Sequence, residues 1–578
     1  MRNIATVLGI HVGHDSGAAI VRDGQVMAAI SEERIRHEKH YFGFPEGAVV
    51  EVMKLSATTP EEIGLIAFSA YSFSHNTAKN ERGLMVNLFE TISPYFHDTG
   101  ASRQVSKLLG KTRRKQMLRF LEKLGLDGKE VVYLEHHSSH AAVAYRLSPF
   151  SYDDKVLVLT CDGVGDGASA TVSLGEGGEI KRIAESSAYD SLGIFYSALT
   201  VHLGMKAFDH EYKVMGLAPY GRYDLGYDKE RPLLGKMQSL IRINPRDKLT
   251  FKNTSGAWGE KLENKLSYFL AKERFDNVAA AAQKHLEDVL LDWVQEAIRK
   301  TGTNKVATGG GTFLNVKANK LLREKFEDVE FFFNPICDDA GLPAGAALEG
   351  YYMLCKRDGR KPEKTALSTL YWGSEWAEED IVKAIEQRNW NNRAKRVDDM
   401  EGTIPHLLKD GFVVARFDGR TEFGPRALGN RTIMADPRDY NVTRKLNFMI
   451  KMRDFWMPFA PSILSERKAD YLVSPKEAPY MIEAFDTTEK RNDIVAATHP
   501  YDNTCRPQTV VKEWNPEYHR TIEIWSELTG VGAILNTSFN LHGYPIVNSP
   551  EQALWTLENS HLDYLAVGNW LVKNRTIQ

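Results

Sequence analysis

Cysteine is scarce in this sequence, and its placement excludes the usual cysteine-based sites. The four cysteines are scattered and form no C-x-x-C pair: Cys161, Cys337, Cys355 and Cys505. A disulfide framework and a zinc ribbon both need cysteines at close, regular spacing. We therefore expect reduced thiols and a cytoplasmic protein.

Long apolar runs and an excess of charge of one sign are also missing. The 578 residues carry a formal net charge of −3, with 26% charged and 43% hydrophobic residues. So balanced a chain gives no electrostatic reason to expect a nucleic-acid or membrane partner. No uninterrupted apolar run is long enough to cross a bilayer. The N-terminus lacks the apolar region of a signal peptide, because His11 and His14 interrupt it.

What the sequence does contain is a repeated layout in its first half. Residues 6–30 read TVLGIHVG, HDSG, AAIV, RDG and QVMAAI, and residues 155–186 read KVLVLTCDG, VGDG, ASATVSL, GEGG and EIKRIAES. Each predicts a strand, a polar glycine loop, a strand, a turn and a third strand, with glycine where hairpins need positive φ. We expect an α/β domain with duplicated β-meander/α units whose facing loops embrace a ligand. The pattern resembles the actin-like ATPase superfamily, which includes sugar kinases and the TsaD family.

The segment Lys356–Lys364 turns polar and basic and contains proline and glycine, which is typical of a linker. It predicts a first domain over residues 1–362 and a second domain over residues 363–578. The second domain would have a normal domain size. The C-terminal tail of the second domain can pack back on the first. Further strands are expected at GFVVARFDG and VGAILNTSF in the second domain.

The stretch EHHSSHAA at residues 135–142 places His136 and His140 four apart, on one face of a predicted helix. That spacing presents two nitrogens to one metal ion, although it also occurs in helices that bind none; His137 faces elsewhere. Asp162 and Asp339 each follow a predicted strand, where a carboxylate faces the ligand crevice of α/β folds or simply forms a turn or caps a helix. Together the two pairs suit iron(II), manganese or zinc.

Three further segments favour bound phosphate. TGGGTFLN at residues 308–315 is a glycine-rich loop between a strand and a helix, which lets backbone N–H groups approach a phosphate or serves packing alone. EYKVMGLAPYG at 211–221 places Lys213 beside a glycine-proline loop, which either contacts phosphate or is an ordinary surface loop. In the second half, cations are interleaved with Gly, Pro and Phe, which favours a concave pocket for triphosphate over a solvated basic face or a nucleic-acid patch.

The motifs occur in an order that resembles the O-carbamoyltransferases of the NodU/CmcH (TobZ-like) family. The motifs are GHDSGAAIVRDG, SEER, HHSSHAA, CDGVGDG, EYKVMGLAPYG, GGGTFLN and DDAGLPAGAA, then GRTEFGPRALGNRT, KMRDFWMPFAP and NTSFN. The resemblance covers essentially the whole chain and implies a TsaD-like domain followed by an α+β YrdC-like domain. Thr432 stands where serine is usual, and Met457 where an arginine often precedes the proline, which weakens any role assigned to that position.

The resemblance also implies the site residues. The iron ligands would be His136, His140, Asp162 and Asp339, with Mn²⁺ or Zn²⁺ as alternatives to Fe²⁺ and with the adjacent Asp338 as an alternative to Asp339. Nucleotide contacts in the first domain would come from Lys213, Gly310, Gly311 and Asn315. The site for ATP with Mg²⁺ and carbamoyl phosphate would be lined by Arg420, Arg426, Arg431, Lys451, Arg453, Arg506, Ser538 and Asn540.

The family chemistry implies two steps, in which carbamoyl-adenylate forms and then passes its carbamoyl group to an alcohol. Lys451 and Arg453 would be catalytic in the first step, and His14 would lie near the attacking hydroxyl in the second, unless it is a loop histidine bonded to the backbone. The partner would be a small-molecule hydroxyl of a sugar or natural product, as in antibiotic and other secondary metabolism, and a homodimer is the assembly considered. Residues 71–100, aromatic and irregular, are either an acceptor pocket or an insertion.

Three other functions fit less well. A tRNA-modifying enzyme that uses threonylcarbamoyl-adenylate would carry a basic surface stripe, which the near-neutral charge disfavours. A sugar kinase would leave the second domain unexplained. A non-catalytic nucleotide-binding protein would release no pyrophosphate from ATP and carbamoyl phosphate.

Overall fold

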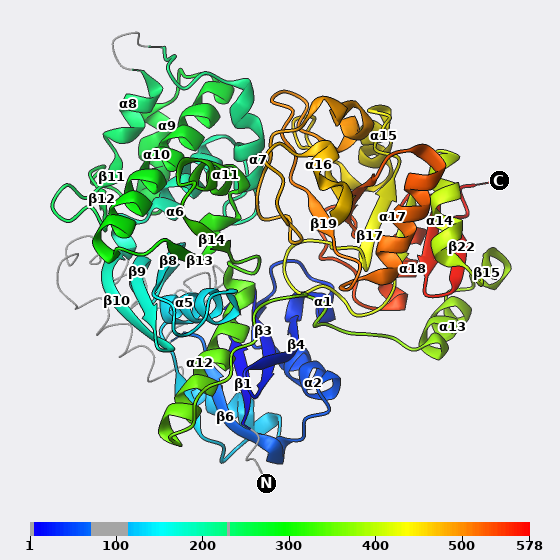
Figure 1. The fold of residues 1–578 in the computed structure, drawn as a ribbon, viewed down its shortest axis with the longest axis horizontal. Helices are drawn as coiled ribbons and strands as arrows, with labels where there is room; N and C mark the ends of the chain where they lie inside the picture. Colours follow the sequence, from blue (N-terminus) through cyan, green and yellow to red (C-terminus); the bar gives the residue numbers. More distant parts are fainter. Residues whose placement is uncertain (1–4, 71–113, 228–231, 578) are drawn as a thin grey trace. The chain divides into compact units, whose positions relative to one another are not determined.

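The computed structural model describes residues 5–70, 114–227 and 232–577, so the predicted acceptor segment 71–100 lies outside the described residues. Its contacts divide the chain into two units. The first comprises Met1–Glu32 and Tyr41–Leu367, and the second comprises Glu33–His40 and Ser368–Gln578 (Figure 1). Within the described residues, no helix combines the length and the apolar character needed to cross a membrane.

The first unit contains two five-stranded sheets with the same strand order. One is β4(Gln25–Ser31)-β3(Gly17–Arg22)-β1(Thr6–His11)-β6(Ile63–Phe68)-β7(Val131–Tyr133). The other is β10(Glu179–Ser187)-β9(Ala168–Glu176)-β8(Val156–Gly165)-β13(Lys305–Gly309)-β14(Glu330–Phe333). In each, an antiparallel meander is followed by two parallel strands. The predicted duplicated meander is therefore confirmed, in a mixed α/β architecture.

Helices α5 (His136–Leu147) and α12 (Leu342–Arg357) pack on each other and on these sheets, α12 on β1 and α5 on β8 (Figure 1). Their approach is close because glycines remove side chains at the crossings. A Cβ at Gly345 would lie 2.2 Å from the Ser139 carbonyl oxygen, and one at Gly9 would lie 1.9 Å from that of Pro343. Helix α5 is consequently buried along nearly its whole length, histidines included.

The second unit is built on one eight-stranded sheet. Its order is β15(Ala394–Arg396)-β22(Trp570–Lys573)-β21(Tyr564–Val567)-β16(Val414–Phe417)-β17(Arg431–Ala435)-β20(Ala533–Ser538)-β18(Ala460–Leu464)-β19(Gln508–Val510). Alternate residues of a strand face opposite sides of a sheet. Ala415 therefore packs with α13 (Glu378–Gln387) and α18 (Pro550–Glu558), while Val414 packs with α14 (Met400–Lys409) and α17 (Pro516–Thr529).

The division between the units falls at Leu367 and Ser368, a few residues beyond the predicted 362/363 boundary. The linker packs on the first unit as far as Leu367, whose N–H donates to the Leu147 carbonyl at 2.9 Å. Near the C-terminus, strand β22 pairs with β21 inside the second unit, and packing of the tail on the first domain stays a prediction.

The segment Glu33–His40 belongs to the second unit although it lies early in the sequence. Arg34 Nη2 donates to the Gly424 carbonyl at 2.7 Å, and the His37 ring lies 5.1 Å from each of the rings of Tyr544 and Trp555. No local pattern in SEERIRHEKH predicts this, because Gly424 is 390 residues from Arg34 along the chain and the partners of His37 are more distant still.

Candidate functional site

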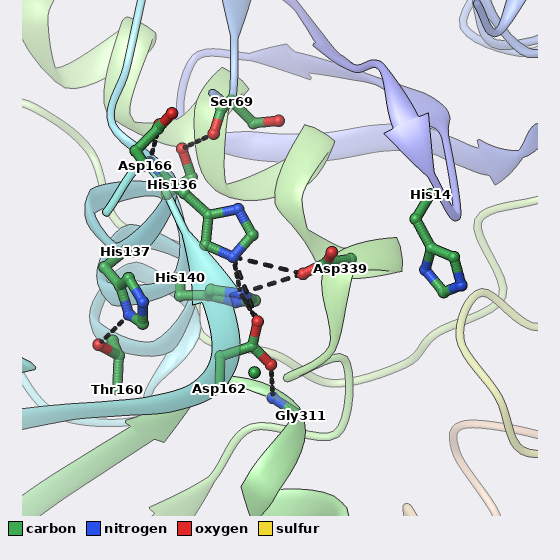
Figure 2. A network of polar contacts seen from close by, with 12 residues as sticks. His14, Ser69, His136, His137, His140, Thr160, Asp162, Asp166, Gly311 and Asp339 are labelled. Carbon is green, nitrogen blue, oxygen red and sulfur yellow. Dashed lines mark hydrogen bonds and ion pairs between the residues drawn. The ribbon is translucent and has the colours of Figure 1, made fainter. Parts of the chain in front are cut away.

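The two histidines and two aspartates predicted as metal ligands meet in the first unit. His136 and His140 rise from α5, Asp162 lies in β8, and Asp339 begins the short helix η6 (Asp339–Gly341) (Figure 2). The imidazole Nε2 atoms are 3.1 Å apart. Asp339 Oδ1 lies 3.4 Å from each Nε2, and Asp162 Oδ2 lies 3.3 and 3.8 Å from those of His136 and His140. Of the two adjacent aspartates, Asp339 supplies the oxygen that faces the imidazoles.

The sequence suggested that Asp162 follows the end of a strand, but the residue lies inside β8. The pairing of β8 with β9 shifts register between Cys161 and Gly165. Such an irregularity re-aims side chains at the rim of a sheet. Here it coincides with the carboxylate that faces the imidazoles.

The carboxylates and imidazoles of this cluster shift one another's pKa values. Burial lowers the pKa of His136, but the carboxylates of Asp339 and Asp162 outweigh it and raise that pKa to about 10. Burial acts to raise the pKa of Asp162, and its contacts with His136 and His140 nevertheless hold it well below the usual range. Without a cation, the cluster therefore retains protons on imidazole, and a bound cation would replace them.

The donor set fits a divalent ion. Metal bonds to imidazole nitrogen and carboxylate oxygen are about 2.0–2.2 Å long, so two ligands of one ion lie about 3–3.5 Å apart. The four donor atoms lie within 4.8 Å of one another, and most pairs are near that spacing. Asp339 Oδ1 is buried and makes no hydrogen bond among the described residues. A mixed nitrogen and oxygen set suits Fe²⁺, Mn²⁺ or Zn²⁺, and the geometry alone does not choose among them.

Two acidic residues that the sequence reading missed fix the start of α5. Asp166 Oδ2 accepts the backbone N–H of His136 at 3.0 Å. Glu135 caps the helix because its Oε2 accepts the backbone N–H of Ser138 at 2.7 Å. The same oxygen accepts a hydrogen bond from Arg182 Nη2 at 2.5 Å. Burial raises the pKa of Glu135, but Arg182 dominates and brings it to about 2. Glu135 could have been found as the capping residue that precedes HHSSH.

Gly165 leaves the space that the His136 ring occupies. A Cβ at this position would lie 2.1 Å from the ring atoms Cγ and Cδ2 of His136. Gly165, the second glycine of CDGVGDG, is therefore required to leave room for the His136 ring, a role that the sequence alone did not reveal.

His137 points away from the cluster, as its helical position predicted (Figure 2). Its Nδ1 is 2.8 Å from Thr160 Oγ1, which is 2.6 Å from Thr171 Oγ1. Burial lowers the pKa of His137 to about 3. It is a neutral side chain that ties α5 to β8.

The glycine loop at residues 308–315 contacts the cluster through its backbone. Gly311 N–H donates to Asp162 Oδ1 at 2.8 Å, and Gly310 N–H donates to the Cys337 carbonyl at 2.7 Å. Gly310 has a φ of 90°, and a Cβ there would lie 2.2 Å from the Cys161 carbonyl oxygen. Both N–H groups therefore already have acceptors, and Gly310 lets the loop lie directly against the Cys161 backbone.

The other two nucleotide contacts predicted for the first unit lie near this loop or in α7. Asn315 caps α11 (Val316–Lys325) through its Oδ1, which accepts the N–H of Ala318, and its Nδ2 donates to Gln283 at 2.8 Å. Lys213 is partly buried on α7 (Glu211–Leu217). The nucleotide roles of these residues and of the two glycines stay predictions.

In the second unit, Lys451 forms hydrogen bonds with the NTSFN segment, residues 536–540. It is buried, and its Nζ donates to Ser538 O at 2.5 Å, Asn540 Oδ1 at 2.8 Å, and Ser538 Oγ and Asn540 O at 3.2 Å. Arg453 Nη2 donates to Thr537 Oγ1 at 3.2 Å. Burial lowers the pKa of Lys451 well below its usual value, and the positive charges of Arg453 and Lys39 lower it further. The structure thus brings KMR and NTSFN together.

A buried carboxylate, absent from our sequence reading, organises the loop GRTEFGPRALGN beside them. Glu422 Oε1 accepts the backbone N–H groups of Leu428, Asn430 and Arg431 at 2.8, 2.8 and 3.1 Å, while its Oε2 makes no hydrogen bond among the described residues. Arg416 Nη1 donates to the Gly429 carbonyl at 3.0 Å. The backbone of the loop is therefore fixed before any ligand arrives.

More buried side chains hold the carbonyls of the same loop. Leu428 O accepts from Tyr371 at 2.8 Å and from Gln508 at 2.7 Å, and Ala427 O accepts from Asn536 at 3.2 Å. Since these donors come from distant parts of the second unit, the loop is a rigid part of its core.

The predicted arginines take different positions around this loop. Arg431 is 0% exposed, its guanidinium lies 3.7 Å over the Phe417 ring, and it donates to the carbonyls of Asp418 and Gly419. These contacts favour support of the loop over direct phosphate contact. Arg420 donates to the carbonyls of Trp372 and Gly373 and is half-buried, as are Arg426 and Arg506.

His14 belongs to β2 (Gly13–His14), which pairs with β5 (Phe42–Gly43). Its side chain stands apart from the four clustered residues in Figure 2 and is 23% exposed. Its Nδ1 lies 2.8 Å from Asp15 Oδ2.

Two family models match this chain. Residues 6–348 match the model described as carbamoyltransferase N-terminus, and residues 405–574 match the model described as carbamoyltransferase C-terminus. The first contains the His/Asp cluster, and the second contains Lys451, NTSFN and the loop around Glu422.

Named relatives agree with these matches. Nodulation protein NolNO of Sinorhizobium fredii is 32% identical over 97% of this chain and 79% of its own length. A 3'-hydroxymethylcephem-O-carbamoyltransferase of Streptomyces clavuligerus is 26% identical over 62% of this chain and 63% of its own. A crystal structure of full-length HypF in a phosphate- and nucleotide-bound form is 14% identical, covers 61% of this chain and 46% of that one, and has a TM-score of 0.36, too low to support an inference.

Proposed function

Because this chain belongs to the carbamoyltransferase family, we propose that it is an O-carbamoyltransferase that works through carbamoyl-adenylate. In this proposal carbamoyl phosphate and ATP yield carbamoyl-adenylate in the second unit. The first unit then transfers the carbamoyl group to a hydroxyl of a small molecule, with AMP as the leaving group. The observation that carries the proposal is the pair of unlike sites, an acid–imidazole cluster in the N-terminal match and a buried lysine amine with oxygen-rich partners in the C-terminal match.

Formation of the adenylate balances as two displacements. Water releases phosphate from carbamoyl phosphate and leaves carbamate, whose oxygen attacks the α-phosphorus of ATP and releases pyrophosphate. Negative charge grows on phosphate oxygens in both, and fixed cations in a dry site stabilise it. Lys451 and Arg453 are the residues that would do so, with Mg²⁺ accompanying ATP. Lys451 would exchange some of its bonds to Ser538 and Asn540 for phosphate oxygens.

Transfer to the alcohol needs a base and a polarised carbamoyl group. His136, His140, Asp162 and Asp339 would hold a divalent cation, most simply Fe²⁺, whose chemistry at such a site is that of a Lewis acid. His14 would accept the proton of the attacking hydroxyl, since a neutral imidazole suits general-base work near neutral pH.

The acceptor is proposed as a small molecule that carries an alcohol. Two relatives are named for carbamoyl transfer to a 3'-hydroxymethylcephem, and others are named as nodulation proteins. Threonylcarbamoyl transfer to tRNA is less favoured because the net charge of −3 offers no electrostatic footprint for RNA.

The test follows both halves of the reaction in one assay. The purified chain is incubated with Fe²⁺ or Mn²⁺, MgATP and carbamoyl phosphate, with and without 3'-hydroxymethylcephem, monosaccharides and oligosaccharides. We expect pyrophosphate that depends on carbamoyl phosphate, and one acceptor that gains a single carbamoyl group by mass spectrometry. Absence of pyrophosphate from a folded, metal-loaded protein would refute the adenylate route.

A further inference from the structure

A chain of buried hydrogen bonds connects the helix that carries the two clustered histidines to the backbone of His14. Ser139 Oγ, on α5, donates to the Ser69 carbonyl at 3.2 Å. Ser69 Oγ lies 2.7 Å from His11 Nδ1, and His11 Nε2 lies 3.0 Å from the His14 carbonyl oxygen. Ser139, Ser69 and His11 are each at most 4% exposed. Figure 2 shows Ser69 beside the cluster, with His14 on the neighbouring hairpin.

The acceptors in this chain fix the tautomer of His11. A carbonyl oxygen can only accept, so His11 Nε2 must carry the hydrogen that is shared with His14 O. Nδ1 is then the acceptor, and Ser69 Oγ donates to it. Burial lowers the pKa of His11 to about 4, against the pull of Asp339, so the ring is neutral near neutral pH.

A second contact acts on the ring of His14. Its Nδ1 lies 2.8 Å from Asp15 Oδ2, and an ionised carboxylate can only accept. The Nδ1–H tautomer is therefore favoured, which puts the lone pair on Nε2. Asp15 has a φ of 53°, a left-handed conformation that aspartate tolerates better than most residues. Gly13, on the other side, has a φ of 119°.

We propose that Asp15 and His11 are positioning residues for His14, the first through the tautomer of its ring and the second through its main chain. The inference rests on the proposed function, in which His14 accepts the proton of the acceptor hydroxyl. The two residues act on different atoms of His14, so their effects are separable. Since the chain through Ser69 begins on α5, the base is held relative to the same helix that carries His136 and His140.

The direct test reads the tautomers and needs no acceptor. The full chain is labelled with ¹⁵N-histidine, and long-range ¹H–¹⁵N spectra assign the protonated nitrogen of His11 and His14 with His11→Gln and His14→Gln as assignment variants. We expect His11 as Nε2–H and His14 as Nδ1–H. In Asp15→Asn, whose amide can donate to Nδ1, His14 shifts toward Nε2–H. An Nε2–H tautomer of His14 in the wild type, or no change in Asp15→Asn, overturns the role of Asp15.

A kinetic test separates positioning from general damage, with 3'-hydroxymethylcephem as the probe acceptor. Asp15→Asn should lower kcat for transfer by about 100-fold, the usual contribution of a general base, with KM for the acceptor changed less than about 2-fold. Asp15→Glu should recover part of the loss. Ser69→Ala, which removes one neutral hydrogen bond, should lower kcat about 5-fold, and Ser69→Thr, which keeps the hydroxyl, should not.

Failure of this inference and failure of the proposed function give different results. If the wild type forms no pyrophosphate and no product, the proposed function fails, and the tautomers still decide whether Asp15 and His11 hold His14 in the stated form. If the wild type transfers the carbamoyl group while Asp15→Asn and Ser69→Ala retain its kcat, the positioning role is wrong. Equal losses in Ser69→Ala and Ser69→Thr would also overturn the role of the Ser69–His11 link.

Discussion

The His/Asp cluster of the first unit and the Glu422 loop of the second are both buried and polar, yet they balance their charges differently. In the cluster, Asp339 Oδ1 is buried, makes no hydrogen bond among the described residues, and faces two imidazoles at 3.4 Å. In the loop, Glu422 Oε1 accepts three backbone N–H groups of its own chain segment. In our proposal a cation would complete the first arrangement, whereas the protein itself largely completes the second, so the two regions should respond differently to substitution.

The largest difference is expected from His140→Ala. The variant removes one of four clustered donors, so affinity for Fe²⁺ or Mn²⁺ should fall more than about 100-fold and carbamoylated product should disappear. The free energy of unfolding should fall far less than for a comparable loss in the loop, because without metal the buried carboxylates of the cluster are balanced only by protons on the imidazoles. Metal analysis and product assays check this, with His137→Gln as the matched control on the same helix. Normal metal content in His140→Ala would refute the metal site.

Glu422→Ala should show the opposite pattern, with metal content kept and stability lost. It leaves three buried N–H groups without an acceptor, at about 1–3 kcal/mol each, so the free energy of unfolding should fall by roughly 3 kcal/mol or more. Denaturant unfolding of the second unit, followed by its tryptophans, measures the loss. The exposed Glu379→Ala should change stability by less than about 0.5 kcal/mol. Equal stabilities of the two variants would mean that the loop does not depend on Glu422.

Much of the cluster could be predicted from sequence, and little of the loop. The i, i+4 spacing identified His136 and His140, and the ends of two strands with the family resemblance identified Asp162 and Asp339. The loop was recognised as a carrier of arginines, but Glu422 was missed because its partners are backbone N–H groups that leave no trace in residue types. Arg431 was taken for a ligand contact, whereas its observed bonds go to backbone carbonyls.

Long-range placement was the other feature that the sequence could not supply. The segment Glu33–His40 joins the second unit through contacts such as Arg34 with Gly424, and neither residue carries a periodic signal for the other. The bond of His11 to Ser69 depends likewise on the pairing of β1 with β6, which only the fold defines. By contrast, hairpins and the end of α10 (Phe275–Thr301) at Gly302 followed from local glycine chemistry.

Gly165→Ala tests whether the shape of the cluster matters as much as its donors. The new Cβ would lie 2.1 Å from the His136 ring, so the ring must move, and metal affinity should fall about 10- to 100-fold with all four ligands present. Gly235→Ala is the matched control, since no atom lies within 4 Å of the place its new Cβ would take and its φ is not positive. Calorimetric titration with Mn²⁺ compares them. Unchanged affinity in Gly165→Ala would show that His136 is not held where the structure places it.

A smaller effect is expected from pH at the His/Asp cluster of the first unit. The pKa of His136 is raised from 6.5 to about 10, so its contribution to the stability of the metal-free fold is full below pH 6.5 and is lost as pH rises through about 10. A cation must displace that proton, so affinity for Mn²⁺ should rise with pH over the same window. Thermal unfolding with chelator and with Mn²⁺, measured from pH 6 to 10, follows both. Affinity that falls with pH would contradict the protonation described for the cluster.

The central proposal is that the two units perform separate halves of one reaction. The most direct measurement compares pyrophosphate and carbamoylated product from the same wild-type protein, first stripped of metal by a chelator and then reloaded with Fe²⁺, with MgATP, carbamoyl phosphate and 3'-hydroxymethylcephem present. We predict that the metal-free protein still forms pyrophosphate but no carbamoylated product, and that reloading restores the product. Loss of both from a protein that remains folded, or product formation without metal, would contradict the account.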